Sequence, residues 1–307
     1  MTEKRFDLVV VGEINPDLIL SGDVEPVFGQ VEKLVDGLTL TVGASSSIFA
    51  CGAARLGLRT AFIGKVGQDE FGRFMKDALR QRCVDVSGVV EDSQVPTGIS
   101  VILSKGNDRA ILTYPGTIPR LRFCDISEEI VAQARHLHMA GYFILDDLRP
   151  EALKVFSQAR RLGLSTSLDT NYDPSQKWDG GLDELLDMVD VFLPNEVECC
   201  AIAGAPDLDE AMQALSNRVG VVVVKQGERG ARLRRGQETY VASIIPVEVV
   251  DTVGAGDSFD GGFLYGYLAG WDLARSLRLA TICGCLSTQK AGGINAQPTL
   301  GEALAYL

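Results

Sequence analysis

Residues 251–259 read DTVGAGDSF, and no other stretch of the chain is as informative. Gly254 and Gly256 let backbone amides approach an anion closely, because glycine has no Cβ and adopts unusual backbone angles. An apolar run, residues 259–268, follows and predicts a helix whose N-terminus adds a partial positive charge. A strand-like run, residues 244–250, precedes it. The stretch therefore predicts a strand, an anion-binding turn and a helix, as in α/β proteins.

The rest of the chain alternates in the same way between short β-branched runs and longer amphipathic segments. Strands are predicted at residues 6–12, 60–66, 136–141, 164–169, 189–194 and 219–225. Helices are predicted at residues 45–56, 69–82, 127–135, 149–162, 181–187, 208–219, 256–269 and 272–291. This alternation indicates crossover connections and a mostly parallel sheet covered by helices on both faces.

Two segments interrupt the alternation, residues 18–41 and 96–114. The second contains two alternating runs separated by Gly106, Asn107 and Asp108, which are typical of a hairpin turn. We expect these insertions to form a small antiparallel β lid on one α/β domain that spans residues 1–307, because no linker or repeat is visible. Exposed edges of lid strands favour pairing with a second copy, so we expect a homodimer through the lid.

Composition excludes several classes of function. Of the 307 residues, 46% are hydrophobic and 23% charged, which is ordinary for a globular protein. The formal net charge is -12 and no basic run is present, which argues against binding to nucleic acid or to an anionic membrane. An anionic small substrate stays compatible with this charge, because helix N-termini and a few lysines act locally.

The cysteines and the N-terminal sequence favour a cytoplasmic protein. Seven cysteines form no C-x-x-C pair, so reduced, buried thiols are expected rather than a disulfide framework. Only two histidines occur, His136 and His138, which excludes a histidine-rich metal site. Both fit the apolar core of a strand. The first apolar run is too short for a signal peptide, and no apolar stretch is long enough to span a membrane.

Polar residues follow four of the predicted strands, where ligands bind in open α/β sheets. Any one of these clusters is ordinary turn chemistry, but four at one edge of a sheet indicate a shared site. The clusters are Glu13, Asn15 and Asp17; Asp169, Asn171 and Asp173; Asn195, Glu196 and Glu198; and Lys225, Gln226, Gly227 and Gly230.

Asp257 is the candidate general base. Capping of the helix is the alternative role, but a cap does not explain two glycines and a second acid, Asp251, in the same turn. The turn is not a Walker loop, since no Gly-Lys-Ser/Thr sequence is present. An acid beside an anion-binding turn suits phosphoryl transfer, in which the amides hold a γ-phosphate and the acid accepts a hydroxyl proton. The helix dipole is expected to make this acid a weak base.

At this point the sequence resembles the ribokinase-like (PfkB) carbohydrate kinase family. Residues 251–263, DTVGAGDSFDGGF, match its C-terminal signature almost residue for residue, and further matches follow in the family's order along the whole chain. These are Gly12-Glu-Ile-Asn15-Pro-Asp17, Arg55-Leu-Gly57, Gly64-Lys-Val-Gly67-Gln-Asp69-Glu-Phe-Gly72, Thr97-Gly98, Asn195-Glu196-Val-Glu198, Lys225-Gln-Gly227-Glu-Arg-Gly230 and Gln297-Pro298-Thr299. The resemblance implies a ribokinase-like three-layer sandwich and an ATP-dependent kinase for a sugar-like alcohol.

The resemblance also implies roles for the reacting end of the site. Asp257 would be the catalytic base, and the amides of Gly254, Ala255 and Gly256 would form the anion hole. Asn15 and Asp17 would hold substrate hydroxyls.

For the nucleotide and its ions, the resemblance implies a further set of positions. Asn195 and Glu198 would lie near Mg²⁺ and phosphate, and Lys225, Gly227 and Gly230 would lie along ATP. Asp251 and Gly292 would belong to a site for a monovalent cation such as K⁺. On the helix predicted at residues 272–291, we expect small residues, including Cys283, to line the adenine pocket; packing of the helix is the alternative.

One departure from the family concerns substrate recognition. The family's N-terminal signature has two adjacent glycines and, four residues after the second, an asparagine that faces the sugar. These positions are Gly43, Ala44 and Ile48 here. The acceptor is therefore expected to be less hydroxylated on that face than a pentofuranose, or to bind in another pose. Arg109 in the predicted lid is a candidate contact for an anionic substrate, with a solvated lid charge as the alternative.

Two other functions remain open at this stage, a nucleoside kinase of the same family and a catalytically silent sugar-binding regulator. The intact Asp257 and its glycines argue against the regulator. A nicotinamide dehydrogenase is excluded, because the first predicted strand is followed by Gly12-Glu-Ile-Asn-Pro-Asp17 and not by G-x-G-x-x-G.

Overall fold

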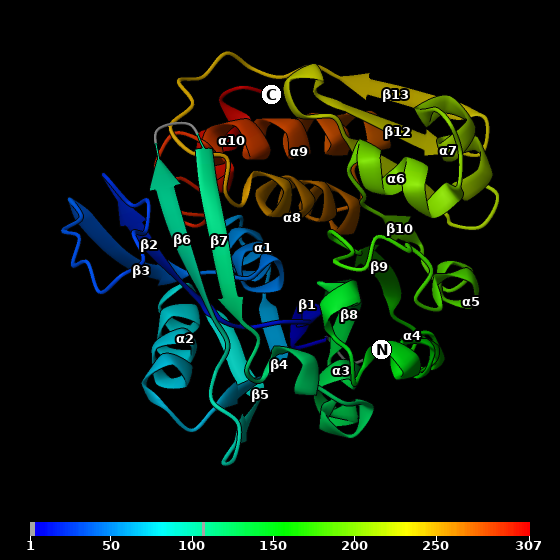
Figure 1. Ribbon diagram of the computed structural model, residues 1–307. Coiled ribbons are helices and arrows are strands. Elements are labelled where there is room, and N and C mark those ends of the chain that lie inside the picture. The colour runs from blue at the N-terminus through cyan, green and yellow to red at the C-terminus, as the bar shows by residue number, and fades with distance from the viewer. Residues whose placement is uncertain (1–3, 106–107) are drawn as a thin grey trace.

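A nine-stranded sheet crosses the molecule in the order β13-β12-β11-β10-β9-β8-β1-β4-β5 (Figure 1). The computed structural model describes residues 4–105 and 108–307. The strands of this sheet are β1 (Phe6–Val11), β4 (Thr60–Gly67), β5 (Val84–Asp92), β8 (Ala134–Ala140), β9 (Ser165–Asp169), β10 (Val191–Phe192), β11 (Val221–Lys225), β12 (Ala231–Arg235) and β13 (Glu238–Ala242). Every pair from β11 to β5 is parallel, and β12 and β13 add an antiparallel edge. The predicted mostly parallel sheet is confirmed.

Helices cover both faces because the strands are apolar on both sides. Along β1, Val9 and Val11 pack into one buried cluster, and Leu8 and Val10 pack into the other. The first face carries α3 (Glu128–Ala132), α4 (Ala152–Arg161), α5 (Leu182–Leu186), α6 (Glu196–Ala203) and α7 (Leu208–Leu215); the second carries α1 (Ser45–Arg55), α2 (Glu70–Gln81), α8 (Ala255–Leu268) and α9 (Leu273–Ser287), with α10 (Leu300–Leu304) against α9. The molecule is therefore the predicted three-layer α/β sandwich.

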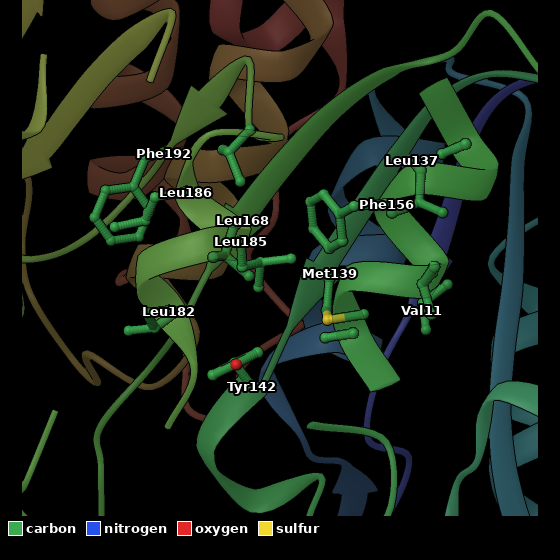
Figure 2. Close-up of a cluster of buried hydrophobic side chains, with 14 of the residues drawn as sticks. Val11, Leu137, Met139, Tyr142, Phe156, Leu168, Leu182, Leu185, Leu186 and Phe192 are labelled. Carbon is green, nitrogen blue, oxygen red and sulfur yellow. The ribbon is translucent and has the colours of Figure 1, made fainter. Parts of the chain in front are cut away.

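The first of these clusters is drawn in Figure 2, where side chains from β8, β9, β10, α4 and α5 interdigitate. Phe156 and Phe192 are completely buried in it. Truncating a buried phenylalanine to alanine typically costs about 3–5 kcal/mol of stability, so this layer fixes α4 firmly on the sheet. The rigid sheet in turn fixes its carboxyl-end edge, where the polar clusters lie.

A second sheet of four strands stands beside the first, in the order β3-β2-β6-β7 (Figure 1). Its strands are β2 (Pro16–Ser21), β3 (Gly37–Val42), β6 (Ile99–Lys105) and β7 (Asp108–Tyr114). The pairs β2–β3 and β6–β7 are antiparallel, as predicted, but the central pair β2–β6 is parallel. The two strands come from different insertions, so no hairpin forces them to run in opposite directions.

The predicted hairpin turn between β6 and β7 lies mostly outside the described residues. Gly106 and Asn107 are not described, and Asp108 is the first residue of β7.

The prediction of a strand at residues 244–250 is wrong. Strand β13 ends at Ala242, and the following segment has no regular structure. Pro246 lacks the N–H that a strand needs, and Ile245 is buried against Leu279 and Ile282 of α9. The apolar character of the run therefore reflects packing across a helix.

Five elements of the described chain are not predicted from the sequence: β5, α6, α10 and the two strands of the hairpin β12–β13. In the described part of the chain, no helix combines the length and apolar character that a membrane span requires.

Candidate active site

The glycine-rich turn connects the irregular segment, residues 243–250, to α8. Its first glycine, Gly254, is required by the backbone conformation. Gly254 is the N-cap residue of α8 and has φ 73°. A Cβ at this position would lie 2.7 Å from the carbonyl oxygen of Gly293 and 2.8 Å from Cγ2 of Ile48. The helix begins at Ala255, whose amide donates to the Thr252 carbonyl at 3.3 Å. The next amides, at Gly256 and Asp257, lie in the first helical turn, where no carbonyl within the helix accepts them.

A cavity of about 370 Å³ opens beside this turn. It lies between the turn that follows β11, residues 244–249, and the facing sides of α8 and α9. Its lining residues are Lys225, Gly227, Glu228, Gly230, Ile244, Ile245, Pro246, Val247, Val249, Thr252, Ala255, Gly256, Phe259, Thr281, Gly284, Cys285 and Thr288. A largely apolar cavity that ends at glycine amides and an ammonium group suits a nucleotide, with the base in the apolar part.

Cys283 does not line this cavity, contrary to prediction. Thr281, Gly284, Cys285 and Thr288 share one face of α9 at helical spacing and reach the cavity. Cys283 points elsewhere and is buried, and a Cβ on Gly262 of α8 would lie 3.0 Å from its Sγ. The alternative noted from the sequence, packing of the helix, is the correct one.

Asp257 lies in the first turn of α8 and is buried, with 8% of its surface exposed. Burial raises its pKa to about 8, and the charges of Asp169 and Glu13 act in the same direction. Lys225 and a hydrogen bond from Ser45 oppose this shift of the pKa. The expected weakening of this base by the helix dipole is therefore outweighed by desolvation.

Lys225, at the end of β11, also lies at the turn. Its Nζ donates to Asp169 at 2.7 Å and to both oxygens of Asp260 at 3.1 and 3.2 Å. A Cβ on Gly256 would lie 3.7 Å from this Nζ. The lysine is thus adjacent to the anion-binding turn.

Asn195 and Glu198 form a capping box at the N-terminus of α6. The Asn195 side chain accepts from the Glu198 amide at 2.9 Å, and Glu198 accepts from the Asn195 amide at 2.8 Å and from its side-chain Nδ2 at 2.7 Å. Burial raises the pKa of Glu198 to about 7, with a further contribution from Asp169. A carboxylate that resists ionisation in this way favours a cation beside it.

Asn15 and Asp17 follow β1 at the base of the second sheet and are both buried. Asn15 donates to Ser100 Oγ of β6 at 3.4 Å. Burial raises the pKa of Asp17 to about 7, opposed by Arg109 and reinforced by Asp251. Gly43 is needed next to Asp17, because a Cβ there would lie 2.1 Å from the carboxylate.

The two departures from the family signature have clear structural consequences. Ala44 is the N-cap residue of α1 and has φ 64° and ψ 129°, a conformation that normally requires glycine. Ile48 presents only hydrocarbon: a Cβ on Gly293 would lie 2.5 Å from its Cδ1. Its side chain therefore packs under the glycine-rich turn and offers no hydrogen bond to a ligand.

Asp251 holds the turn to the segment that follows α9. Its carboxylate accepts from the amides of Val253 at 3.0 Å and Gly292 at 2.8 Å. Arg109 of β7 reaches across from the second sheet, with its Nη1 3.5 Å from Asp251 Oδ1. Arg109 is therefore a solvent-exposed charge of the second sheet, as the alternative states, that also pairs with Asp251.

Other predicted polar residues serve the loops. The Asp173 carboxylate accepts from the amides of Ser175, Lys177 and Trp178, so it shapes its own turn. Asn171 bridges the Gly141 amide and the Ser45 hydroxyl. Both histidines are buried in β8, as expected, and hydrogen-bonded to serines of β9.

Two acids near the turn were not assigned a role from the sequence. Glu13 is buried and accepts from the amide and hydroxyl of Ser46 in α1. Asp260 is buried on α8, one turn after Asp257. The position of Asp260 within the motif was the available signal, because an acid in an otherwise apolar helix has to be paired.

A mostly parallel sheet, a small second sheet and a cavity that ends at a glycine-rich helix N-terminus and a lysine are the features expected of a small-molecule kinase. Comparison with known proteins agrees: residues 5–300 match the model of the pfkB family carbohydrate kinases, and the chain belongs to this family. The predicted ATP-dependent carbohydrate kinase is thereby confirmed at the level of the family.

Individual relatives cover the whole chain. The 5-dehydro-2-deoxygluconokinase of Geobacillus thermodenitrificans is 29% identical, over 99% of this chain and 94% of the relative. The structure of Arabidopsis thaliana ribokinase complexed with ribose and ATP has a TM-score of 0.83 at 26% identity, over 98% of both chains. An E. coli protein of the ribokinase type, solved with ATP and Mg²⁺, has a TM-score of 0.89 at 24% identity, also over 98% of both chains.

Proposed function

We propose that this protein transfers the γ-phosphate of Mg·ATP to a hydroxyl of a sugar-like substrate, with Asp257 as general base. The observation that carries the proposal is the position of Asp257: a buried acid with a pKa of about 8 lies in the first helical turn after Gly254, next to a cavity that suits a nucleotide. Anion binding and proton acceptance are thus available within one helical turn.

The reaction would proceed by in-line displacement. The acceptor oxygen attacks the γ-phosphorus and its proton passes to the Asp257 carboxylate, while the bond from phosphorus to the bridging oxygen breaks and ADP leaves. The amides at the start of α8 stabilise the charge on the transferred group, since they are already oriented before the reaction. Asn15 and Asp17, at the base of the second sheet, would orient the acceptor.

Mg²⁺ would accompany ATP and complete the charge balance. Asn195 and Glu198 supply an amide oxygen and a carboxylate, which suits an ion that is held by few protein ligands and by substrate phosphates. We also propose the loop of Asp251 and Gly292 as the place of a monovalent cation such as K⁺. Both oxygens of Asp251 already accept hydrogen bonds from backbone amides, so backbone carbonyl groups would supply most of the ligands of this cation.

A sugar acid is the acceptor that the site favours. Ile48 removes a hydrogen-bonding group from the pocket, and Arg109 adds a guanidinium beside Asp17 and Asp251. One relative is named for a gluconate-type acceptor, which carries a carboxylate. We infer that Arg109 binds such a carboxylate, and that the four-stranded sheet serves as the lid of one kinase domain.

A coupled assay of ADP release tests the proposal, with Mg·ATP and a panel of neutral sugars, sugar acids and nucleosides. We expect turnover with a sugar acid and loss of turnover in Asp257→Asn. Turnover with nucleosides alone would reassign the acceptor class, and the absence of turnover with every acceptor would refute the proposed reaction.

A further inference from the structure

Lys225 lies at the centre of a buried group of charged side chains that have no role in the proposed reaction as described above. Its Nζ is bound by Asp169, the last residue of β9, at 2.7 Å and by Asp260 of α8 at 3.1 Å. Three separate elements of the main fold therefore converge on one ammonium group. Burial alone would lower its pKa, but the charges of Asp169 and Asp260 outweigh this and raise the pKa above its usual value, so the group is protonated at neutral pH.

The lysine is the member of this group that meets the cavity. The side chains of Asp169 and Asp260 are each 2% exposed, whereas that of Lys225 is 14% exposed. Lys225 lines the cavity together with Gly227 and Gly256. The acids are thus more deeply buried than the lysine, and Lys225 is the member of this group that lines the cavity.

The number of N–H donors on the Lys225 ammonium group also allows a contact with a ligand. An ammonium group has three N–H donors. One N–H donates to Asp169 at 2.7 Å, and the contacts at 3.1 and 3.2 Å both go to the single carboxylate of Asp260. When one N–H is shared between the two oxygens of Asp260, the third N–H is free to donate to a phosphate oxygen beside Gly256, whose Cβ position lies 3.7 Å from Nζ.

We propose that Lys225 is a catalytic residue that donates to the transferred phosphoryl group, and that Asp260 and Asp169 are positioning residues that hold its ammonium group at the glycine-rich turn. The inference rests on the proposed phosphoryl transfer.

Electrostatics explains why the arrangement needs this cation. Five acidic side chains, those of Glu13, Asp169, Glu198, Asp257 and Asp260, are buried around the turn. A phosphate group added to them would be repelled, and repulsion between charges is strong where water is excluded. A fixed ammonium group offsets this repulsion at the point where charge develops during transfer. Since Asp260 lies one turn from Asp257 on α8, the helix also sets the spacing of lysine and base.

A transition-state analogue separates this role from a structural one. Mg·ADP alone lacks the transferred group, and Mg·ADP with aluminium fluoride mimics it. We expect Lys225→Met to bind Mg·ADP within about threefold of the wild type but to lose about 10²-fold in affinity for the aluminium fluoride complex, the usual effect of removing one preorganised donor. Titration calorimetry measures both affinities without any need for turnover.

Lys65→Met is the matched control. Lys65 of β4 is also largely buried, pairs with Asp125 at 2.7 Å, and lies outside the cavity lining. This variant tests the loss of a buried ion pair as such, and it should bind both complexes like the wild type. Equal affinity of Lys225→Met and wild type for the aluminium fluoride complex would overturn the inference.

A double-mutant cycle tests the role of Asp260. If Asp260 acts through Lys225, the double variant Lys225→Met/Asp260→Asn binds the aluminium fluoride complex no more weakly than Lys225→Met alone. Effects that multiply would overturn the positioning role. Phosphorylation by the wild type keeps the two hypotheses apart: a wild type that phosphorylates no acceptor refutes the proposed function, whereas an active wild type with an unaffected Lys225→Met refutes only this inference.

Discussion

Asp257→Asn is the substitution that tests the proposed chemistry most directly. Asparagine keeps the shape of the side chain and can still accept the hydrogen bond from Ser45, but it accepts no proton. Because a general base contributes typically about 10²–10⁴-fold, kcat should fall by that factor. Binding of Mg·ADP should survive, since the turn binds phosphate through backbone amides. A coupled assay and calorimetry measure the two effects on the same preparation.

The raised pKa of Asp257 also predicts the pH dependence of the wild type. With a pKa of about 8, the carboxylate of the free enzyme is ionised in only about a tenth of molecules at pH 7 and in about nine tenths at pH 9. The base works only when ionised, so kcat/KM of the wild type should rise about tenfold between these values. The residual activity of Asp257→Asn should lack this rise.

The pH dependence of the free energy of unfolding gives an independent check on the raised pKa of Asp257. The folded state holds a proton on Asp257 up to a pH of about 8, whereas the unfolded chain releases it near its ordinary pKa of 3.8. The free energy of unfolding of the wild type therefore decreases as the pH rises through this window. Asp257→Asn avoids this loss, so its stability relative to wild type should increase from pH 4 to pH 8 in urea unfolding experiments.

Asp272→Asn provides the control for a changed acid at a helix N-terminus. Asp272 is the exposed N-cap residue of α9 and accepts from the Arg275 amide at 2.8 Å. This variant should keep full turnover and the wild-type pH profile. Near-wild-type turnover of Asp257→Asn would refute the role of Asp257 as general base. Loss of both folding and nucleotide binding would make its role structural.

Three further predictions concern the backbone, the acceptor and the assembly. Ala44→Gly should raise the free energy of unfolding by about 1 kcal/mol, since it relieves a strained positive φ, whereas Ala50→Gly inside α1 should lower it; a loss of stability in Ala44→Gly would contradict the argument. Arg109→Ala should lower kcat/KM for sugar acids by roughly 10- to 100-fold and leave neutral sugars nearly unaffected; an equal loss for both would exclude a carboxylate contact. Light scattering should give the mass of two chains, and Leu112→Glu, at an exposed apolar position of edge strand β7, should shift it to one; a single-chain mass for the wild type would exclude the lid dimer.

The sequence predicts the layers of the fold well, because burial on both faces makes parallel strands continuous apolar runs. The prediction from sequence fails where an apolar run is buried without being a strand. Residues 244–250 look like a strand, but Pro246 and packing against α9 keep them irregular. The sequence analysis predicts no helix at α6, because Asn195 and Glu198 resemble ligands for Mg²⁺; in the structure they form the capping box that begins this helix.

In the site, the sequence predicts which residues reach the edge of the sheet but not how they pair. Lys225 was assigned to the nucleotide by position, yet its partners Asp169 and Asp260 lie 56 and 35 residues away along the chain. Such pairing depends on the order of strands, which periodicity does not reveal. The same limit applies to Arg109, whose approach to Asp251 depends on how the second sheet leans over the first.

Burial around the glycine-rich turn has two opposite consequences, and the function depends on both. Desolvation makes the carboxyl of Asp257 a stronger base than an exposed aspartate, which suits proton transfer from an alcohol. The same desolvation makes the buried acids unfavourable neighbours for the phosphates of ATP. In the proposed reaction, Lys225, which is bound by two of these acids, and the Mg²⁺ that accompanies ATP would be the two cations that offset this repulsion. The buried charges near Asp257 are therefore best understood as one unit: Asp169, whose charge raises the pKa of Asp257, also binds Lys225, the lysine that we propose donates to the transferred phosphoryl group.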